Sequence, residues 1–349
     1  MHVPDGFLDL TTSVGTGAVA VVAVGVAVRQ AGRELNERTV PLAGLTCAFV
    51  FAAQMLNFPV GVGTSGHLMG GALAAALVGP WTGVLCLAVV LVVQALLFAD
   101  GGLTALGTNI TLMALTTVLV GWLVTKAVLA VLPRRPRSVV PASAIGAFAS
   151  VVVASLVFVL LYSFGGTAPI PLGTLTASMV GWHTLIGLGE AVMTALTVSA
   201  VVAVRPDLVH AARGLMPTLR LKDGNGELVE VPATGQPGAR PHGAGRTPVR
   251  GLLIGGGVVT LLLAGVVSFF ASSNPDGLEF VAEQRGFLDT AQDHLLGGLA
   301  LTDYGDVGGI PVGVAGVVGV AVTVLIGWLV FRAVRAVSGR SSRLQTVER

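Results

Sequence analysis

The amino-acid sequence predicts an all-α protein that crosses a membrane several times, and three observations lead to that prediction. Hydrophobic residues make up 53% of the 349 residues and charged residues only 11%, whereas a soluble domain carries about 25% charged residues. The apolar residues fall in long runs, most of which reach the ~17–25 residues that a helix needs to cross the hydrocarbon core. Glycine is frequent, with 48 residues, and small residues let membrane helices approach one another closely.

Nine apolar runs are the predicted crossings. They cover residues 11–28, 40–56, 68–79, 83–99, 103–125, 139–164, 177–204, 251–271 and 311–331. The run 68–79 is short, and Gly79-Pro80 separates it from the next run. The sequence leaves open whether this run is a full crossing or a re-entrant segment, and we count it as a crossing or its topological equivalent.

The positions of the basic residues predict the orientation. Of the 20 Lys and Arg residues, 19 fall in four groups, within residues 29–38, 126–137, 205–250 and 332–349. The positive-inside rule assigns all four groups to the cytoplasm, which requires an even number of crossings between the first two groups and therefore needs 68–79 to count. The N-terminus is then outside and the C-terminus cytoplasmic. We expect a cell-membrane protein without a cleaved signal peptide, because residues 1–6 lack a basic n-region, and no nucleic-acid partner, because the net charge is only +2.

The runs divide the chain into two predicted modules. Residues 1–204 hold seven crossings and form a seven-helix module. Residues 205–250, rich in Pro, Gly and Arg, are predicted to be a flexible cytoplasmic linker, with a small hairpin favoured around Asp223-Gly224-Asn225-Gly226. Residues 251–335 are predicted to be a two-helix module that encloses an outside loop, 272–310. Residues 336–349 are a basic cytoplasmic tail.

The first two residues carry the clearest chemical signal. A free amine on Met1 followed by His2 offers three linked nitrogens: the α-amine, the amide nitrogen of His2 once deprotonated, and its imidazole. Three such donors favour a square-planar fourth ligand, a geometry that suits Ni(II) or Cu(II), and Co(II) is also possible. A histidine at this position is equally compatible with no ligand role.

His67 is the candidate fourth ligand. It lies at the outside mouth of the third predicted crossing, on the same side of the membrane as Met1, and three glycines just before it let the loop fold back. A lone histidine at a loop-to-helix junction is also compatible with a polar residue that binds nothing. On these residues alone both interpretations stay open.

Several motifs resemble those of a known family. Residues 1–8 (MHVPDGFL), 63–68 (GTSGHL), 94–109 (QALLFADGGLTALGTN) and 183–191 (HTLIGLGEA) are similar to the CbiM/NikM family, the substrate-binding membrane components of energy-coupling-factor transporters for cobalt and nickel. This resemblance covers about residues 1–204. Residues 274–279 (NPDGLE) resemble the PDGLE domain of the small CbiN/NikN-like partners of those transporters, so both partners look fused in one chain.

The resemblance implies a metal site and a set of supporting residues. Met1, His2 and His67 are implied as the metal ligands, for transported Co(II) or Ni(II) rather than a permanently bound cofactor. Weaker candidates for supporting or gating roles are Asn57, Ser65, Gln94, Asp100, Asn109, His183 and Glu190. Because Glu190 lies near the middle of the seventh crossing, where a charged acid is costly, it is expected to be interior and either protonated or paired. His183, two turns earlier on the same face, is expected to form a polar lock or gate with it, or a packing hydrogen bond.

The expected function is uptake of metal without enzymatic activity. The sequence contains no Gly-x-x-x-x-Gly-Lys-[Ser/Thr] motif, so it cannot bind ATP by a P-loop. The resemblance implies separate ATP-binding cassette ATPase subunits and a transmembrane coupling protein of the CbiQ/NikQ type, in a system that supplies metal for cobalamin synthesis or nickel enzymes. The alternative is a gradient-driven permease that works without such partners. An intramembrane metalloenzyme is less consistent with the sequence, which lacks His-Glu-x-x-His.

Overall fold

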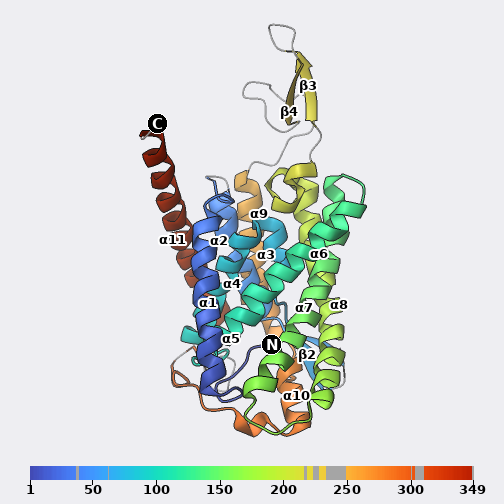
Figure 1. The fold of residues 1–349 in the computed structure, drawn as a ribbon, viewed down its shortest axis with the longest axis vertical. Helices are drawn as coiled ribbons and strands as arrows, with labels where there is room; N and C mark the ends of the chain where they lie inside the picture. The colour runs from blue at the N-terminus through green and yellow to red at the C-terminus, as the bar shows by residue number, and fades with distance from the viewer. Residues whose placement is uncertain are drawn as a thin grey trace.

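The computed structural model describes residues 1–36, 39–61, 63–215, 218–222, 228–232, 249–299, 301–302 and 310–347. Within these residues, apolar helical segments lie at all nine predicted crossings (Figure 1). They are α1 (Leu10–Ala31), α2 (Thr39–Gln54), α3 (Gly71–Val78), α4 (Pro80–Leu97), a continuous rod of α5 (Leu106–Asn109), η1 (Ile110–Thr116) and α6 (Thr117–Val131), then α7 (Val139–Gly165), α8 (Leu172–Val204), α9 (Val249–Gly265) and α11 (Val312–Val347). The fold is therefore an all-α polytopic membrane bundle, as the sequence predicts.

The helices differ in how much of a membrane they can cross. Six segments are long and apolar enough to cross one: 10–31, 80–97, 106–131, 136–165, 172–204 and 312–337. Two apolar helices, α2 and α9, are shorter. The third predicted crossing contains only the eight residues of α3, about 12 Å of helix, so it is not a full helical crossing. Gly79, with a φ of +104°, ends α3, and Pro80 begins α4, as the Gly-Pro pair predicts.

The space that α3 leaves within the bundle holds extended segments. Strands β1 (Phe58–Gly61) and β2 (Thr64–Gly66) form an antiparallel hairpin that leads into α3. Every residue from Thr64 to Val78 is buried, so this loop lies inside the protein and not on its surface. The N-terminal residues run nearby, and Met1 is only 3% exposed. Figure 1 shows the N-terminus within the bundle, close to β2.

The C-terminal helices pack on the first module. Helices α9 and α11 both lie against α2, where Gly256 and Gly327 approach the side chains of Leu45 and Cys47. Between them the chain forms η5 (Val267–Phe270), α10 (Gly277–Arg285) and η6 (Leu288–Thr290), which cover the end of the bundle where the N-terminus enters (Figure 1). This placement brings residues near 275 against residues near 1 and 65.

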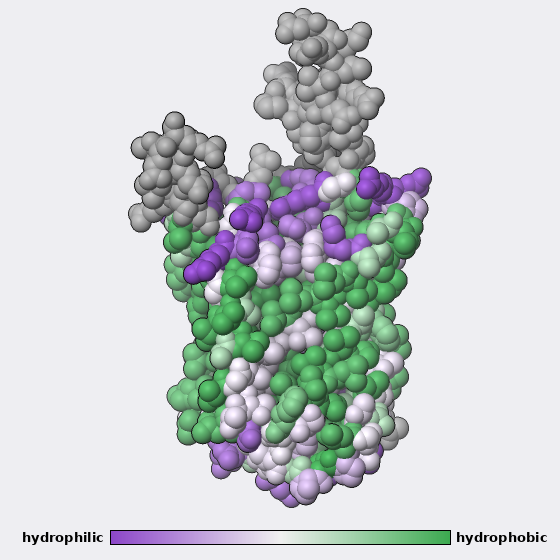
Figure 2. Space-filling view, in the orientation of Figure 1, coloured by the Kyte–Doolittle hydropathy of each residue, from purple (hydrophilic) through white to green (hydrophobic). Residues whose placement is uncertain are grey.

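The surface has the banding of a membrane protein. On the face shown in Figure 2, hydrophilic residues gather at both ends of the bundle and hydrophobic residues cover its middle. The last turns of α1, α6, α8 and α11, which lead into the four basic groups, lie at one end, opposite α10 (Figure 1). That distribution agrees with the predicted topology, although the assignment of the basic end to the cytoplasm stays a prediction.

The predicted linker is ordered where it begins. Its first residues form η3 (Pro206–Leu208) and η4 (His210–Leu215), and η4 packs against α3 because Leu208, Val209 and the following alanines supply apolar side chains that become buried. Strands β3 (Thr218–Lys222) and β4 (Leu228–Pro232) pair antiparallel, as expected for the predicted hairpin. The turn at 223–227, the linker residues 233–248, residues 303–309 of the predicted outside loop and the end of the tail lie outside the described residues.

Candidate metal centre

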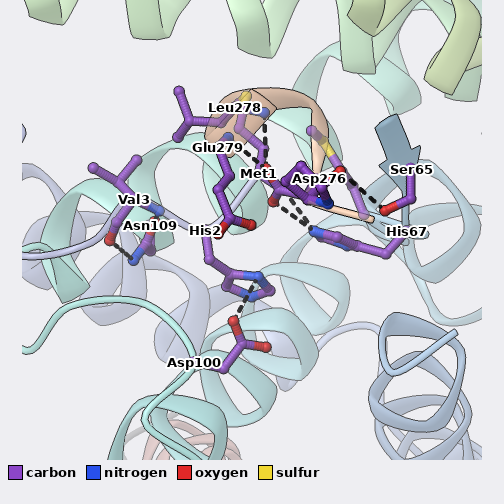
Figure 3. A network of polar contacts seen from close by, with 12 residues as sticks. Met1, His2, Val3, Ser65, His67, Asp100, Asn109, Asp276, Leu278 and Glu279 are labelled. Carbon is purple, nitrogen blue, oxygen red and sulfur yellow. Dashed lines mark hydrogen bonds and ion pairs between the residues drawn. The ribbon is translucent and has the colours of Figure 1, made fainter. Parts of the chain in front are cut away.

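The amine of Met1 lies at the centre of a buried polar cluster (Figure 3). Its nitrogen is 2.5 Å from Nε2 of His67 and 2.9 Å from Oδ2 of Asp276. The same Asp276 oxygen is 3.6 Å from His67 Nε2. Three groups from residues 1, 67 and 276 therefore meet at one point, and two of them are nitrogens that the sequence predicts as metal ligands.

The backbone sets the direction in which His67 faces. Its Nδ1 lies 3.1 Å from the carbonyl oxygen of Leu68, and a carbonyl oxygen can only accept a hydrogen bond, so Nδ1 carries the proton. The lone pair is then on Nε2, which accepts from the Met1 ammonium. In metal sites a histidine commonly donates its second N–H to a carbonyl in this way. His67 thus presents the correct nitrogen toward the Met1 amine.

His2 lies beside His67 but turns its ring nitrogens to other partners. The two imidazole rings stack with centroids 5.0 Å apart and an interplanar angle of 22°. Nδ1 of His2 is 3.1 Å from Asp100 Oδ1, and Nε2 is 3.2 Å from Gln94 Oε1. Burial lowers the pKa of His2 to about 4, against the opposing effect of Asp100, because the imidazolium would lose its hydration. The lowered pKa favours the neutral ring, which has a single N–H and can donate to only one of these two oxygens, so its other nitrogen keeps a lone pair for a metal.

Hydrogen bonds with residues 103–109 hold the N-terminal segment. The Asn109 side chain makes two hydrogen bonds with the backbone of Val3. Its Oδ1 accepts from the Val3 N–H at 2.7 Å, and its Nδ2 donates to the Val3 carbonyl oxygen at 3.0 Å. The carboxylate of Asp5 accepts from the backbone N–H groups of residues 103–105 and from the hydroxyl of Thr104. A Cβ at position 102 would lie 2.2 Å from an Asp5 oxygen, so glycine is required there. These contacts fix where the first two residues begin.

Asp276 comes from the PDGLE motif, and the sequence reasoning did not place it in the site. Its Oδ1 caps α10 by accepting from the N–H groups of Leu278 and Glu279 at 2.8 and 2.9 Å, which leaves Oδ2 for Met1 and His67. Burial alone would raise the pKa of Asp276, but the Met1 ammonium beside it outweighs burial and holds that pKa well below its usual value. The carboxylate is therefore ionised next to the predicted ligands. The motif resemblance was the only signal for it, because 275 residues separate Asp276 from Met1.

Ser65 links the histidine loop to the same motif. Its hydroxyl donates to the carbonyl of Asn274 at 2.8 Å, and its backbone N–H donates to the carbonyl of Pro275 at 2.9 Å. The structure thus brings Ser65 next to His67 and Asp276, as a contact between the two modules. Asn57, in contrast, is not joined to the cluster by any hydrogen bond among the described residues, and its backbone carbonyl accepts from the N–H of Ser272 at 2.7 Å.

His183 and Glu190, both on the buried face of α8, bond to other partners and not to each other. Nδ1 of His183 lies 2.8 Å from the carbonyl of Met179, and its buried Nε2 has no partner among the described residues. Both oxygens of Glu190 accept backbone N–H groups, from Met69 at 2.6 Å and Gly70 at 2.8 Å. The expected direct contact of these two side chains as a lock or gate is therefore absent from the described structure.

The donors at the site suit a nitrogen-bound transition metal. Among the described residues no group of three His, Cys, Asp or Glu side chains could hold a metal ion, so a site here must use the amine and backbone nitrogen of the chain start. Two nitrogens bound at about 2 Å on adjacent corners of a square lie about 2.8 Å apart, close to the 2.5 Å between Met1 N and His67 Nε2. Closing the full chelate requires Nδ1 of His2 to leave Asp100.

Comparison with known proteins identifies the family of each module. The family described as "Cobalt uptake substrate-specific transmembrane region" (CbiM) matches residues 2–208, and the PDGLE domain matches residues 250–336. The chain is 35% identical over 248 residues to a protein named "Fused nickel transport protein NikMN" from Rhodobacter capsulatus, which covers 66% of this chain and 70% of the relative. It is 40% identical over 212 residues to a protein of Archaeoglobus fulgidus named "Putative fused nickel transport protein NikMN". That alignment covers 60% of this chain and 68% of the relative.

Solved structures give the same result for the first module. A crystal structure described as that of a transition metal transporter matches with a TM-score of 0.53 and 31% sequence identity, over 58% of this chain and 93% of the other. The resemblance in the four N-terminal motifs and in the NPDGLE motif is thereby confirmed. The chain belongs to the CbiM family of cobalt and nickel transport components, as a multi-pass membrane protein that carries a PDGLE domain in the same polypeptide.

Proposed function

We propose that this chain captures Co(II) or Ni(II) at the outer face of the membrane and passes it inward as the substrate-specific component of an ATP-driven energy-coupling-factor transporter. The observation that carries the proposal is the 2.5 Å contact between the Met1 amine and His67 Nε2 inside the bundle. The α-amine, the deprotonated amide and imidazole Nδ1 of His2, and His67 Nε2 would be the four ligands. ATPase subunits and a coupling membrane protein would supply the energy for release, and no enzymatic step is needed.

The surrounding residues would hold these ligands and not bind metal themselves. Asn109 would fix the N-terminal segment that carries the amine and the His2 amide. Asp100 and Gln94 would hold the His2 ring while the site is free of metal, and Asp100 would attract the incoming cation. Ser65 would keep the histidine loop against the PDGLE motif. For His183 we propose a supporting role beside the PDGLE turn, and the contacts of Asn57 give it no part in the site.

Calorimetry with the full chain and a native N-terminus tests the metal assignment. Titration with Ni(II) and with Co(II) is expected to give one tight site per chain for at least one of them, together with release of protons, because the amine and the His2 amide must both lose a proton to bind. A ligand field of four nitrogens in the absorption or X-ray spectrum of the loaded protein is the second expected result. Oxygen or sulfur donors in that spectrum would reject the site.

Asp276→Asn is expected to slow metal loading by about tenfold while changing equilibrium affinity much less. The metal-free site carries one positive charge, on the ammonium. The loaded site also carries one, because the two charges of the metal are offset by the deprotonated amide. The Asp276 carboxylate therefore stabilises the metal-free and the loaded site to a similar extent, but it attracts the incoming cation and so speeds loading. Asparagine removes this charge and preserves the cap of α10.

Stopped-flow loading of Ni(II) measures this effect, with Asp289→Asn as the matched control. Asp289 lies in the same module, on η6, and is exposed. We expect its substitution to leave the loading rate unchanged. If Asp276→Asn loads at the wild-type rate, the carboxylate does not attract the cation.

A further inference from the structure

We propose that Glu190 is a positioning residue for the metal centre: it fixes the loop that carries His67, so that α8 controls how tightly the metal is held. The proposal rests on the function proposed above, because it assumes that His67 is a ligand. It assigns to Glu190 a role different from a lock with His183, since the two side chains do not bond to each other.

The first argument is the way in which Glu190 is bonded. Its side chain is completely buried in the bundle, where a carboxylate is costly unless its oxygens are satisfied. Oε2 accepts the N–H of Met69 at 2.6 Å and Oε1 accepts the N–H of Gly70 at 2.8 Å. Both oxygens therefore accept hydrogen bonds from two consecutive backbone N–H groups. Two bonds fix the orientation of this peptide segment as well as its distance from α8.

The second argument is that, among the described residues, Glu190 is the partner of both of these N–H groups, while Gln54 holds only the carbonyl oxygen of Met69, at 3.0 Å. Gly70 precedes the first turn of α3, has a φ of +81° and offers no side chain to cap the helix. The N–H of the residue that precedes the first turn has no partner within the helix, so the Glu190 carboxylate supplies from α8 an acceptor for Gly70 as well as for Met69. Met69 is only two residues beyond His67. The carboxylate thus fixes the chain on one side of His67, while the pairing of β1 with β2 fixes it on the other.

The third argument is that α8 contacts both parts of the site through one face. One turn before Glu190, Ile186 packs so closely that a Cβ at Gly66 would lie 2.7 Å from it and a Cβ at Gly277 would lie 2.5 Å from it. Gly66 is the residue before His67, and Gly277 is the residue after Asp276. A shift of α8 along its axis would therefore move the His67 loop relative to the Met1 amine. The bond between the metal and His67 would be the first to weaken.

Glu190→Gln tests the proposal in the full chain with a native N-terminus. Glutamine keeps one carbonyl oxygen but turns an NH₂ group toward a backbone N–H, so one of the two amides loses its acceptor. We expect Ni(II), chased with an excess of chelator, to dissociate roughly 10–100-fold faster, as for other residues that orient metal ligands, and the visible absorption band of the bound Ni(II) to shift. In the metal-free protein, the amides of Met69 and Gly70 should exchange hydrogen faster than in the wild type.

Two further variants keep the test decisive. Glu190→Asp retains both oxygens on a shorter side chain and should lie between the wild type and Glu190→Gln. Thr194→Val, one turn along the same buried face, should behave like the wild type. Wild-type dissociation and exchange in Glu190→Gln would overturn the proposal, as would equal effects in Thr194→Val; if Glu190→Gln does not fold, wild-type values in Glu190→Asp would overturn it. A wild-type protein that binds no metal would instead reject the proposed function, and amide exchange would still report on the anchor.

Discussion

Residues added before Met1 are expected to abolish high-affinity metal binding. The extension converts the α-amine into an amide, which removes one of four donors and one chelate ring. Structural sites with four ligands bind with about 10–16 kcal/mol, or about 3 kcal/mol per ligand, so losing one weakens binding roughly a hundredfold. The amine is also fully buried against Asp276, so added residues have to displace that carboxylate and the turn that carries it. The true loss should exceed the estimate for one ligand.

Calorimetry on matched proteins measures this loss. The same extension placed after residue 349 leaves the Met1 amine free and should bind metal as the wild type does. Thermal unfolding of both proteins reports whether the extended N-terminus still folds into the bundle. Tight binding of Ni(II) or Co(II) by the N-terminally extended protein would remove the amine from the site.

Much of the fold could be predicted from hydropathy because membrane helices must satisfy their own backbone and present apolar side chains. The runs at 139–164 and 177–204 correspond to α7 and α8, and Gly79-Pro80 marks a helix boundary. Hydropathy did not predict that only eight residues of the third run are helical. Residues 64–70 are all buried, and a count of apolar residues does not distinguish a buried loop from a helix.

The site was predictable only in its local parts. Met1 and His2 are neighbours in sequence, so their chelate follows from covalent structure, and His67 could be matched to them through topology. The contacts of Asp276 with Met1, of Asp5 with residues 103–105 and of Glu190 with Met69 all join distant segments. No periodicity or spacing encodes such contacts, because they depend on how the helices pack. His183 and Glu190 illustrate the same point, since each makes an internal hydrogen bond to a different backbone group: a shared helix face brings side chains into line but does not choose their partners.

The contacts of Met1 with His67 and Asp276 bring two of the proposed donors together. The Met1 ammonium donates a hydrogen bond to His67 Nε2 and forms an ion pair with Asp276. These two contacts keep the nitrogens of Met1 and His67 close together. The carboxylate therefore stabilises the charged amine in the position that it needs as a ligand. If the proposed ligands are correct, little rearrangement remains for these two donors, and the main movement on loading would be the rotation of His2 away from Asp100.

His67→Ala is expected to weaken metal binding by roughly a hundredfold, again about 3 kcal/mol for one ligand of four, while the protein still inserts and folds. The loop keeps its other anchors, since Ser65 remains bonded to Asn274 and Pro275 and Glu190 remains bonded to Met69. The three donors of Met1 and His2 stay in place, and a water molecule or a weak oxygen donor takes the fourth position. The loaded variant should therefore show three nitrogens and one oxygen in its X-ray spectrum.

Added imidazole separates a lost ligand from a damaged fold. The substitution removes a ring from a buried site, so free imidazole can enter the space and restore the fourth nitrogen, and affinity should rise with its concentration. His294→Ala is the matched control, because His294 bonds only locally to the N–H of Leu296 in the described structure and should bind metal normally with or without imidazole. If His67→Ala binds as tightly as the wild type without imidazole, then His67 is not a ligand, and the chelate of Met1 and His2 must find its fourth donor elsewhere, with Asp276 the nearest candidate.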